Sequence, residues 1–498
     1  MRILLVNPPR YHKALYSLRD EICFQDVAYV PFPIRLAQLG AILQENKDWS
    51  VQTLDANASR WGWDELENRL PESDVVIFQS AAGLIAHDAR VAEMVKRRTG
   101  AKTVLIENVV APVYPQRILE DFPQIDFVIC GFPETIVPDL LRNLDYPGRV
   151  PGVAFRGQSA DATTERPGDI EDMDALPLMA YDLFDPQRYS IGYLDAPMHE
   201  RIVPGIRLRT SRDCPFGCPF CLVGAGRGRG YTGKWRAMSP ARVLRELEHV
   251  VRTHGVHGFF FWDETFTLNK KRAAEICDGI IARKLDIEWR CLTRIDCVDD
   301  SLLRKMSRAG CKLIEYGIEA GDATVRAKLQ KRFSDDDAVE IVRATRKAGI
   351  RANCDMIVGM PWETRATLDR TLRLAMRLAA DNVHLTMAFP LPRTAFHDMA
   401  EAEGLLETND IYAKMIHERV RVGAKPYVRT RALSAADLEK AWKRIRKQVN
   451  RYYFVRNVLL RPWDMRHVFA GARSTKGVLA LIPKAPNFVL KHLLGSRG

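Results

Sequence analysis

Short apolar runs alternate with longer stretches of helical periodicity through residues 1–145. Polar or turn residues bound the short runs, as expected for buried strands, and the longer stretches gather apolar residues on one helical face. The predicted strands are 3–6, 51–54, 74–78, 103–106 and 127–130, and the predicted helices are 34–43, 86–98, 115–121 and 135–144. This alternation predicts an α/β fold that begins with a doubly wound, Rossmann-like parallel sheet.

Residues 146–200 break the alternation, because they are rich in Pro, Gly, Asp and Thr and show weak periodicity. They are predicted to form a linker, with a short hairpin at 152–155. The alternation returns over 201–400, with predicted strands at 206–209, 258–262, 288–292, 313–317, 351–358 and 383–389. Six βα units fit a partial (β/α)6 barrel better than the eight units of a closed barrel.

Residues 401–498 are predicted to form a helical, basic C-terminal region. The chain has a net charge of +12, and the part from 442 to 498 accounts for all of it, with thirteen Lys or Arg against one acid. Apolar residues such as Tyr453, Phe454 and Trp463 lie between these cations. A basic amphipathic helix on an anionic membrane surface and a solvated helix packed on the barrel both account for this pattern.

The composition places these elements in a soluble protein of several domains. A length of 498 residues favours two or three hydrophobic cores. No apolar run is long enough to span a membrane, and an early Pro-Pro pair interrupts the N-terminus too soon for a signal peptide. The ten cysteines have no pairing rhythm. A cytoplasmic protein is predicted, with peripheral contact at the inner membrane face as an open alternative.

Three cysteines with the spacing C-x3-C-x2-C carry the clearest chemical signal of the chain. They are Cys214, Cys218 and Cys221, and the proline and glycine residues between them favour a turning loop. Iron–sulfur clusters are held by Cys thiolates, and a [4Fe-4S] cluster has four irons. Three protein ligands leave one iron free to bind a small chelating molecule, which predicts a site for chemistry.

Simpler explanations fit this loop less well. A structural zinc site needs a fourth Cys or His at matching spacing, which neither His199 nor His249 supplies. A disulfide framework does not suit cysteines scattered over a long chain. Free Cys is often a small core residue. Core packing is the prediction for Cys277, Cys291, Cys297, Cys311 and Cys354.

Polar side chains follow several predicted barrel strands, at the end where the active sites of such folds lie. Carboxylates suit an ammonium group or ribose hydroxyls, arginine suits a carboxylate, and a glycine-containing turn lets backbone amides reach an adenine edge. Each of these residues alone is a weak signal, because an Asp or Glu after a strand is usually just a helix N-cap. Together they predict a site for a zwitterionic ligand with an amino group, a ribose and an adenine, formed by Asp263, Glu264, Arg294, Glu319, Gly359 and Glu363.

Residues 205–400 resemble the radical S-adenosylmethionine (SAM) superfamily. The resemblance rests on the cysteine motif with aromatic Phe220 before its third cysteine, and on the runs 261–267, 317–321 and 359–364. It implies a [4Fe-4S] cluster on the three cysteines, whose open iron binds the amino and carboxylate groups of SAM. It also implies a reductase such as flavodoxin or ferredoxin, whose electron would cleave SAM to a 5′-deoxyadenosyl radical that abstracts hydrogen from an unactivated carbon.

The same resemblance implies roles for individual residues. Asp263 or Glu264 would contact the methionyl amino group, and Glu319 the ribose. Phe220 and the turn at Gly359 would flank the adenine. Arg393 stands where the superfamily commonly has glycine, which makes it a candidate substrate contact.

Residues 1–145 resemble the cobalamin-binding domain of one branch of this superfamily. The match lies in 7–9, 36–43, 54–55 and 126–131. It implies corrin contacts at the strand ends, formed by Asn7, Asp55, Ser80, Gly83, Gly131 and Glu134. The chain lacks a D-x-H-x-x-G sequence, so the resemblance does not support a histidine ligand to cobalt, and 107–112 replaces the usual Gly-Gly-x-His turn. A Rossmann-like module with another cofactor or none stays an alternative.

Two functions share this predicted layout. The first is methyl transfer to carbon from methylcobalamin, with a second SAM remethylating the cobalt. The second is an oxidative cyclisation, as in the branch acting on magnesium-porphyrin esters, or a rearrangement with the same cofactors. The basic apolar tail favours a lipid-like or polycyclic small-molecule substrate. RNA modification is disfavoured, because residues 1–145 contain only Cys23 and Cys130 and the tail is the only feature that nucleic acid would explain.

Overall fold

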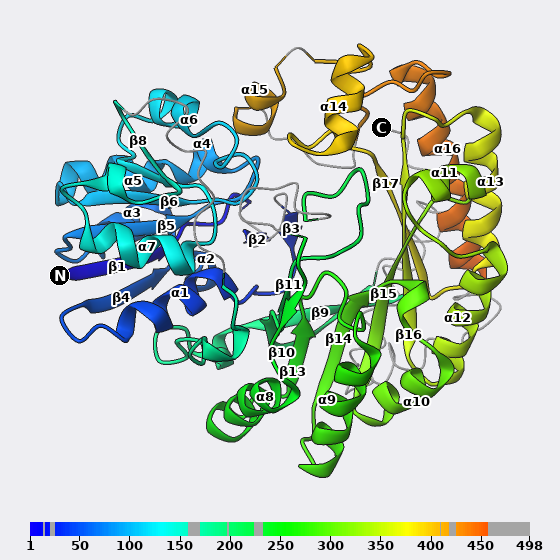
Figure 1. The fold of residues 1–498 in the computed structure, drawn as a ribbon, viewed down its shortest axis with the longest axis horizontal. Coiled ribbons are helices and arrows are strands. Elements are labelled where there is room, and N and C mark those ends of the chain that lie inside the picture. The colour runs from blue at the N-terminus through cyan, green and yellow to red at the C-terminus, as the bar shows by residue number, and fades with distance from the viewer. Residues whose placement is uncertain are drawn as a thin grey trace, which may run out of the picture.

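Two β-sheets with their covering helices make up the body of the protein (Figure 1). The computed structural model describes residues 1–12, 15–19, 25–157, 170–196, 199–223, 233–408, 410–417 and 425–456. Among these residues, no helix is long and apolar enough to cross a membrane.

The first sheet has the strand order β4-β1-β5-β6-β7-β8. Its neighbouring strands are parallel, except that β8 runs antiparallel to β7. Its strands are β1 (Arg2–Asn7), β4 (Ser50–Asp55), β5 (Val75–Gln79), β6 (Lys102–Ile106), β7 (Phe127–Ile129) and β8 (Val153–Phe155). The five predicted strands are confirmed. The hairpin predicted at 152–155 is wrong, because β8 instead pairs with the otherwise open edge of β7.

Helices cover both faces of this sheet, which confirms the doubly wound arrangement (Figure 1). Leu36 and Val137 share one apolar cluster with Ile77, and Val91 shares another with Phe78 on the opposite face. The predicted helix at 86–98 is split in two at Ala89. The helices are α1 (Ile34–Gln44), α2 (Ala56–Ser59), α3 (Trp63–Asn68), α4 (Ile85–Asp88), α5 (Arg90–Arg98), α6 (Pro115–Asp121) and α7 (Pro133–Arg142), and a hairpin is formed by β2 (Tyr16–Leu18) and β3 (Gln25–Val27).

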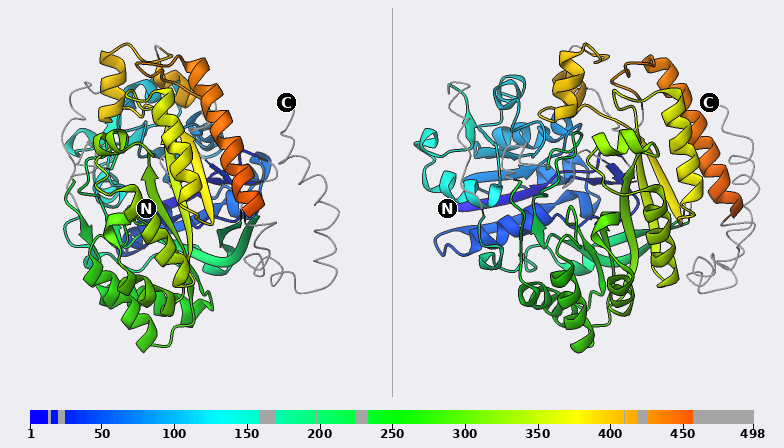
Figure 2. Two further views of the ribbon diagram at one scale, coloured as in Figure 1. Left: turned by 90° about the vertical axis from the view of Figure 1, so that its right-hand side faces the viewer. Right: turned by 45° about the vertical axis from the view of Figure 1, so that its right-hand side comes forward.

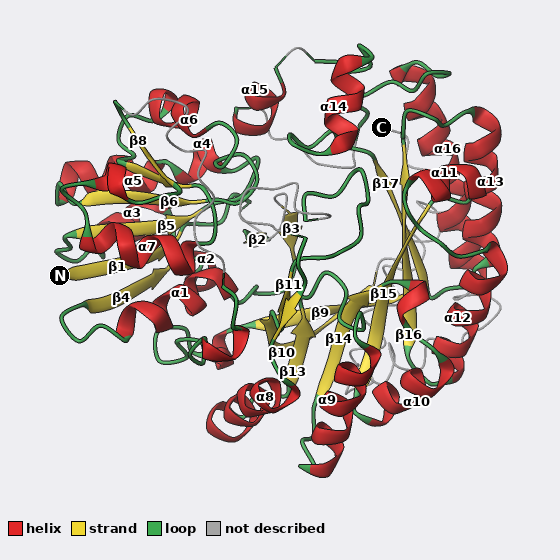
Figure 3. Cartoon of the chain, in the orientation of Figure 1, coloured by secondary structure: helices red, strands yellow, loops and turns green. Residues whose placement is uncertain are grey.

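The second sheet is an open, curled half-barrel with the order β17-β16-β15-β14-β13-β10-β9 (Figure 3). Its six parallel strands confirm the six predicted βα units. The sequence did not predict β9, which pairs antiparallel with β10 inside the expected linker. The strands are β9 (Ser190–Ala196), β10 (His199–Leu208), β13 (Gly258–Phe261), β14 (Glu288–Thr293), β15 (Cys311–Glu319), β16 (Arg351–Val358) and β17 (Asn382–Met387), and β11 (Ser211–Arg212) pairs with β12 (Arg236–Ala237).

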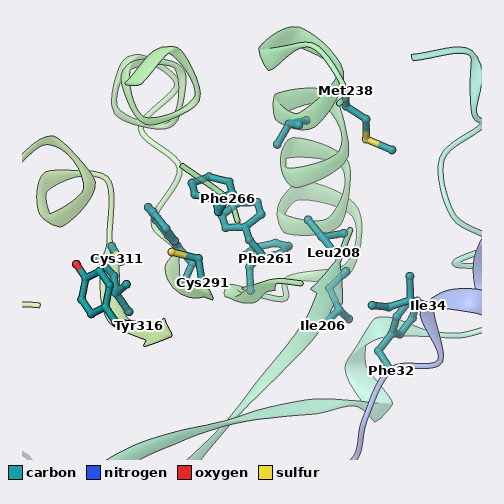
Figure 4. Packing of buried hydrophobic residues seen from close by; sticks show 14 of the residues in the cluster. Phe32, Ile34, Ile206, Leu208, Met238, Phe261, Phe266, Cys291, Cys311 and Tyr316 are labelled. Atoms are coloured by element: carbon teal, nitrogen blue, oxygen red, sulfur yellow. The ribbon is translucent and has the colours of Figure 1, made fainter. Parts of the chain in front are cut away.

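The barrel helices lie on the convex side of the half-barrel (Figure 1). Beneath them Phe261, Cys291 and Tyr316 pack into one core, which also takes in Phe32 and Ile34 from the N-terminal half (Figure 4). A shared core therefore joins the two halves. All five scattered cysteines are buried, as predicted. The helices are α8 (Pro240–His254), α9 (Lys270–Ala282), α10 (Asp300–Arg308), α11 (Ala323–Lys328), α12 (Asp335–Lys347), α13 (Arg365–Arg377), α14 (Ala395–Ala402), α15 (Ile411–Ile416) and α16 (Ala435–Phe454).

The described part of the basic C-terminal region packs on the barrel. The indole of Trp442 in α16 donates a hydrogen bond to the carbonyl of Leu385 in β17 (3.0 Å), and the hydroxyl of Tyr453 donates to the carbonyl of Ala375 in α13 (2.7 Å). Figure 2 shows α16 running along α13. The apolar face of α16 is thus occupied by the barrel, which favours the packed helix over the membrane-bound one for this segment. Residues 457–498, which include Trp463, lie outside the described residues.

Candidate functional site

The cysteine loop begins directly after β11, at the carboxyl end of the barrel strands. Cys218 is buried and Cys214 and Cys221 are partly exposed, and all three are free of disulfide bonds. Among the described residues, no three His, Cys, Asp or Glu side chains gather around one point that a single metal ion would occupy. The loop therefore presents three separate thiols at the barrel mouth.

Two buried ion pairs hold the start of this loop. Arg212 pairs with Glu134 of α7, with a distance of 2.5 Å between Nη2 and Oε1, and Arg236 pairs with Asp213 (2.9 Å). Asp213 takes a left-handed backbone conformation with φ +64°, which is strained for a residue with a side chain. Glu134, predicted as a corrin contact, thus bonds to the residue two positions before Cys214.

Arg294 lies against the same loop. Its guanidinium is 3.7 Å from the centroid of the Phe216 ring, and its Nε and Nη2 donate to Asp296 (2.8 and 2.7 Å). The remaining nitrogen, Nη1, is 3.9 Å from the sulfur of Cys218. Burial raises the pKa of the Cys218 thiol, while Lys331 and Arg294 act in the opposite direction. Arg294 therefore places a positive charge beside the thiol.

Asp263 and Glu264 follow β13, and their environments differ. The Oδ1 of Asp263 accepts hydrogen bonds from the backbone N–H groups of Thr210 (2.6 Å) and Ser211 (2.9 Å), and its Oδ2 accepts from the Thr210 hydroxyl (2.5 Å). The Oε2 of Glu264 is buried without a hydrogen-bond partner among the described residues. Burial raises the pKa of Glu264 to about 7, against the opposing charge of Arg209. Asp263 thus holds the turn before the cysteines, and Glu264 is the carboxylate open to a ligand.

Glu319 ends β15 with φ +69°, again a left-handed conformation at a residue with a side chain. Its Oε1 lies 2.9 Å from the Nζ of Lys331, which also donates to the carbonyl of Gly317 (3.0 Å). Such strain persists only where the surroundings enforce it, and it is commonest at functional sites. The strained backbone and the lysine therefore fix the position of the Glu319 carboxylate at the barrel mouth.

Gly359 follows β16 with φ +105°, which favours glycine. The Oε2 of Glu363 accepts from the N–H groups of Gly359 (2.5 Å) and Met360 (2.9 Å), and its Oε1 is buried without a partner among the described residues. Burial raises the pKa of Glu363 to about 7. The ring of Phe220 packs against the cluster that contains Met360. Phe220 and the Gly359 turn, the two elements predicted to flank adenine, thus border the same apolar cluster.

Arg393 adopts φ +66° in the loop after β17. Glycine, the residue that the superfamily resemblance led us to expect at this position, takes such a conformation without strain. The backbone shape expected for glycine is therefore kept here with an arginine side chain.

At the edge of the first sheet, Asn7 and Asp55 belong to an internal network. The Nδ2 of Asn7 donates to Asp55 Oδ1 (2.9 Å), and the hydroxyl of Tyr189 donates to Asp55 Oδ2 (2.8 Å). The Nε2 of Gln79 donates to Asn7 Oδ1 (3.2 Å). All four side chains are buried. These bonds tie the ends of β1, β4 and β5 to the segment before β9.

Ser80 belongs to a second buried network. Its hydroxyl donates to Asp88 Oδ2 (2.8 Å), and both oxygens of Asp88 accept from the guanidinium of Arg19 (2.8 and 2.9 Å). Gly83 has φ +87° in the turn before α4, and Gly131 is buried just after β7. The predicted corrin contacts thus lie along one edge of the sheet, but most of their polar side chains already have protein partners.

Two residues at this edge were absent from the predicted site. Gln79 Oε1 and Asn108 Oδ1 are buried acceptors without partners among the described residues. Glu107, beside Asn108, accepts three backbone hydrogen bonds, from Val109 (2.9 Å), Val110 (2.7 Å) and Ala111 (2.8 Å). The position of both amides at strand ends was the only signal in the sequence that could have identified them.

Comparison with known proteins identifies a family model and several relatives that this chain matches. Residues 208–375 match the model of the radical SAM superfamily. An uncharacterized methyltransferase of Pyrococcus horikoshii is 27% identical over 492 residues, which cover 97% of this chain and 99% of that protein. The anaerobic magnesium-protoporphyrin IX monomethyl ester cyclase of Cereibacter sphaeroides is 27% identical over 362 residues, which cover 70% of this chain and 54% of the cyclase.

Two solved structures share the fold. TsrM of Kitasatospora setae, a radical SAM methyltransferase solved with cobalamin and a [4Fe-4S] cluster, has a TM-score of 0.63 at 16% identity and covers 89% of this chain and 85% of its own. OxsB, a cobalamin-dependent SAM radical enzyme, has a TM-score of 0.66 at 14% identity and covers 99% of this chain and 72% of its own. Residues 208–375 therefore form a radical SAM domain, the relatives support an enzyme, and the chain has the fold of TsrM and OxsB.

Proposed function

We propose that this protein is a cobalamin-dependent radical SAM enzyme that transfers a methyl group to an unactivated carbon of a small molecule. The observation that carries the proposal is the pairing of a three-thiol loop with the open carboxylate of Glu264 at one barrel mouth. When bound, the cofactors supply a 5′-deoxyadenosyl radical that takes a hydrogen atom from carbon, and a methyl group for that carbon. The residues of the chain bind, orient and shield them.

The donor set of the loop fits a [4Fe-4S] cluster. Cys214, Cys218 and Cys221 supply three thiols from one loop, which leaves one iron of a four-iron cluster without a protein ligand. Arg294 and Lys331 place positive charge near Cys218. Such charge stabilises thiolates, the form that binds iron.

The groups around the loop fit SAM. The unpartnered oxygen of Glu264 suits the methionyl ammonium, and the fixed carboxylate of Glu319 suits ribose hydroxyls. Phe220 and the Gly359 turn offer an aromatic face and backbone for adenine. Arg294 keeps one nitrogen toward Cys218, so it acts beside the cluster, and its bonds to Asp296 leave it less available for the SAM carboxylate.

The edge of the first sheet offers uncharged amide groups that could bind cobalamin. Cobalamin carries amide side chains around its ring, and Gln79 Oε1 and Asn108 Oδ1 are acceptors without partners. The glycine turn at Gly83 allows close approach of the backbone. The side chains of Asn7, Asp55 and Ser80 are already hydrogen-bonded within the protein. Their role would be to stabilise this edge of the sheet.

Oxidative cyclisation is the second candidate. It is favoured by the 27% identity to the magnesium-protoporphyrin ester cyclase, but that match covers only 54% of the cyclase. Methyl transfer is preferred because the uncharacterized methyltransferase of Pyrococcus horikoshii matches over 97% of this chain.

Methyl-labelled SAM tests the proposal. The protein is reconstituted anaerobically with iron, sulfide and cobalamin, reduced by flavodoxin or ferredoxin with their reductase, and incubated with candidate small molecules. Label in a carbon-bound methyl group of the product is expected, together with 5′-deoxyadenosine. A product that has lost hydrogen and carries no label would establish the cyclase. For substitutions of the loop cysteines, the matched control is Cys277→Ala, which alters a thiol in the core and leaves the loop intact.

A further inference from the structure

The segment that follows β7 reaches from the first sheet to the start of the cysteine loop. Glu134 lies in the first turn of α7, and its Oε1 accepts a hydrogen bond from Nη2 of Arg212 at 2.5 Å. The other oxygen, Oε2, lies 3.5 Å from Nη1 of the same guanidinium. Arg212 ends β11, two residues before Cys214. A carboxylate from a helix of the first sheet is thus bonded to the strand that leads into the cysteine loop.

This ion pair is buried and charged. The side chains of Glu134 and Arg212 keep only 4% and 7% of their surface exposed. Burial acts to raise the pKa of Glu134, but the charge of Arg212 and its hydrogen bond hold that pKa below its usual value. The carboxylate is therefore ionised. Because the loss of one partner leaves an uncompensated charge in the interior, the observed position of Arg212 depends on Glu134.

Phe132 makes a second contact between the same two parts of the chain. The guanidinium groups of Arg212 and Arg236 lie 4.7 and 5.9 Å from the centroid of its buried ring. These two arginines stand opposite each other where β11 pairs with β12. The segment after β7 therefore contacts both strands of the small sheet that flanks the cysteine loop in the sequence.

The backbone between the ion pair and the first cysteine is held in a strained shape. Asp213 has φ +64°, and its carboxylate is fixed by Arg236 at 2.9 Å. A residue with a side chain keeps such a conformation only where the surrounding structure enforces it. The two residues before Cys214 are thus each fixed by a buried ion pair, and the pair of Arg212 connects them to the first sheet.

We infer that Glu134 is a positioning residue for the iron–sulfur cluster, because through Arg212 it fixes the start of the cysteine loop relative to the first sheet. This inference rests on the proposed function, since it assumes that the three cysteines hold the cluster. It gives Glu134 a role at the cluster that differs from the corrin contact implied by the family resemblance. The properties of the cluster then depend on a residue of the first sheet.

Glu134→Gln tests this inference in the full-length protein reconstituted with iron and sulfide. Glutamine has the same length and still accepts a hydrogen bond, but it does not balance the charge of Arg212. Two properties are measured, the EPR spectrum of the reduced cluster and the rate at which a chelator removes its iron. A changed EPR spectrum and about tenfold faster loss of iron are expected, as for other residues that orient metal ligands.

Glu246→Gln is the matched control. Glu246 forms an equally short buried ion pair with Arg242 of the same helix, at 2.5 Å. It also accepts hydrogen bonds from the hydroxyl of Tyr181 and the backbone of Met179, so it holds the segment before the barrel. The control is expected to keep the EPR spectrum, and its rate of iron loss should stay within about twofold of the unmodified protein. Equal changes in both variants, or no change in Glu134→Gln, would overturn the inference.

Arg212→Gln and the double variant with Glu134→Gln test whether the two residues act together. Because Glu134 acts through Arg212, the double variant is expected to lose iron no faster than either single variant, within about twofold. Additive effects would contradict the role of Arg212.

Two further measurements keep the outcomes separate. If Glu134→Gln does not fold, as judged by denaturant unfolding, Glu134→Asp replaces it. Aspartate keeps the charge but is shorter, so it is expected to change the EPR spectrum and speed iron loss, and unchanged values would contradict the inference. Failure of the unmodified protein to assemble a cluster would contradict the proposed function. A cluster that assembles and is insensitive to position 134 contradicts only the positioning role.

Discussion

Buried carboxylates lie at the strand ends of both sheets. Their hydrogen bonding differs between the two sheets. At the first sheet, both oxygens of Asp55, Asp88, Glu107 and Glu134 accept hydrogen bonds from the protein. At the barrel, Glu264 and Glu363 each keep one buried oxygen without a partner among the described residues, and burial raises the pKa of each to about 7.

This difference distinguishes carboxylates that stabilise the fold from carboxylates that can bind a ligand. A buried carboxylate whose oxygens are both bonded stabilises the fold, whereas one with an open oxygen is destabilising until a ligand supplies the missing donor. The open oxygens at the barrel edge support the proposed binding of SAM, which carries an ammonium group and hydrogen-bond donors. The first edge leaves neutral amides open instead, at Gln79 and Asn108, which suits a ligand with amide groups.

The largest effect is expected from Cys218→Ala. Removal of one thiolate is expected to lower reductive cleavage of SAM by more than about a hundredfold, since even outer partners of a metal site contribute ten- to a hundredfold. The broad iron–sulfur absorbance should disappear, while cobalamin binding at the first sheet stays intact. Absorbance spectra and 5′-deoxyadenosine yield provide the measurement. A variant that keeps full cluster absorbance would contradict the ligand assignment.

The next largest effect distinguishes Glu264 from its neighbour. Glu264→Gln removes the charge that would pair with the methionyl ammonium, so SAM binding is expected to weaken by about thirtyfold. Asp263→Asn leaves a donor of the Thr210–Ser211 turn without an acceptor, so it is expected to lower the free energy of unfolding by about 2 kcal/mol. SAM binding by equilibrium dialysis and denaturant unfolding are compared. If Asp263→Asn abolished SAM binding at unchanged stability, the roles of the two residues would be reversed.

A smaller pair of effects is expected at the first sheet. There, one residue stabilises the fold and another is proposed to bind cobalamin. Asp55→Ala leaves Asn7 and Tyr189 without an acceptor, and a loss of about 2 kcal/mol in unfolding free energy is expected. Asn108→Ala is expected to leave stability within about 0.5 kcal/mol and to weaken cobalamin binding about fivefold. Cobalamin titration and denaturant unfolding of both variants provide the test. Cobalamin affinity that falls in Asp55→Ala at unchanged stability would place Asp55 in the corrin site.

The last expected effect appears only as a dependence of stability on pH. The pKa of Glu363 is near 7 in the folded protein and 4.5 is its usual value, so the folded state holds a proton between these pH values that the unfolded state releases. Stability is therefore expected to fall as pH rises from 4.5 to 7, by up to about 3 kcal/mol from this group. Glu363→Gln removes this contribution, so the variant should gain stability relative to the unmodified protein at pH 8 but not at pH 4.5. Denaturant unfolding at both pH values measures the difference, and parallel pH curves would contradict it.

The sequence predicted the strands that have strong apolar periodicity, and it failed where pairing depends on distant partners. The strands 3–6 and 351–358 are long enough, or apolar enough, to be recognised locally. β8 and β9 lie in a segment rich in turn residues, and each is stabilised by one neighbouring strand that supplies its hydrogen bonds. A local pattern carries little information about such a neighbour.

By itself, the sequence determined the chemistry available to this protein. The spacing of Cys214, Cys218 and Cys221 defines a three-thiol loop, because ligands within eight residues stay together in any fold. Only the tertiary structure decided which of two neighbouring, chemically similar residues is hydrogen-bonded within the protein and which is open to a ligand. Asp263 and Glu264 look alike in the sequence, but the turn at Thr210 occupies one carboxylate and leaves the other open. Hydrogen-bond satisfaction is a property of contacts between distant segments, so it becomes visible only when the chain has folded.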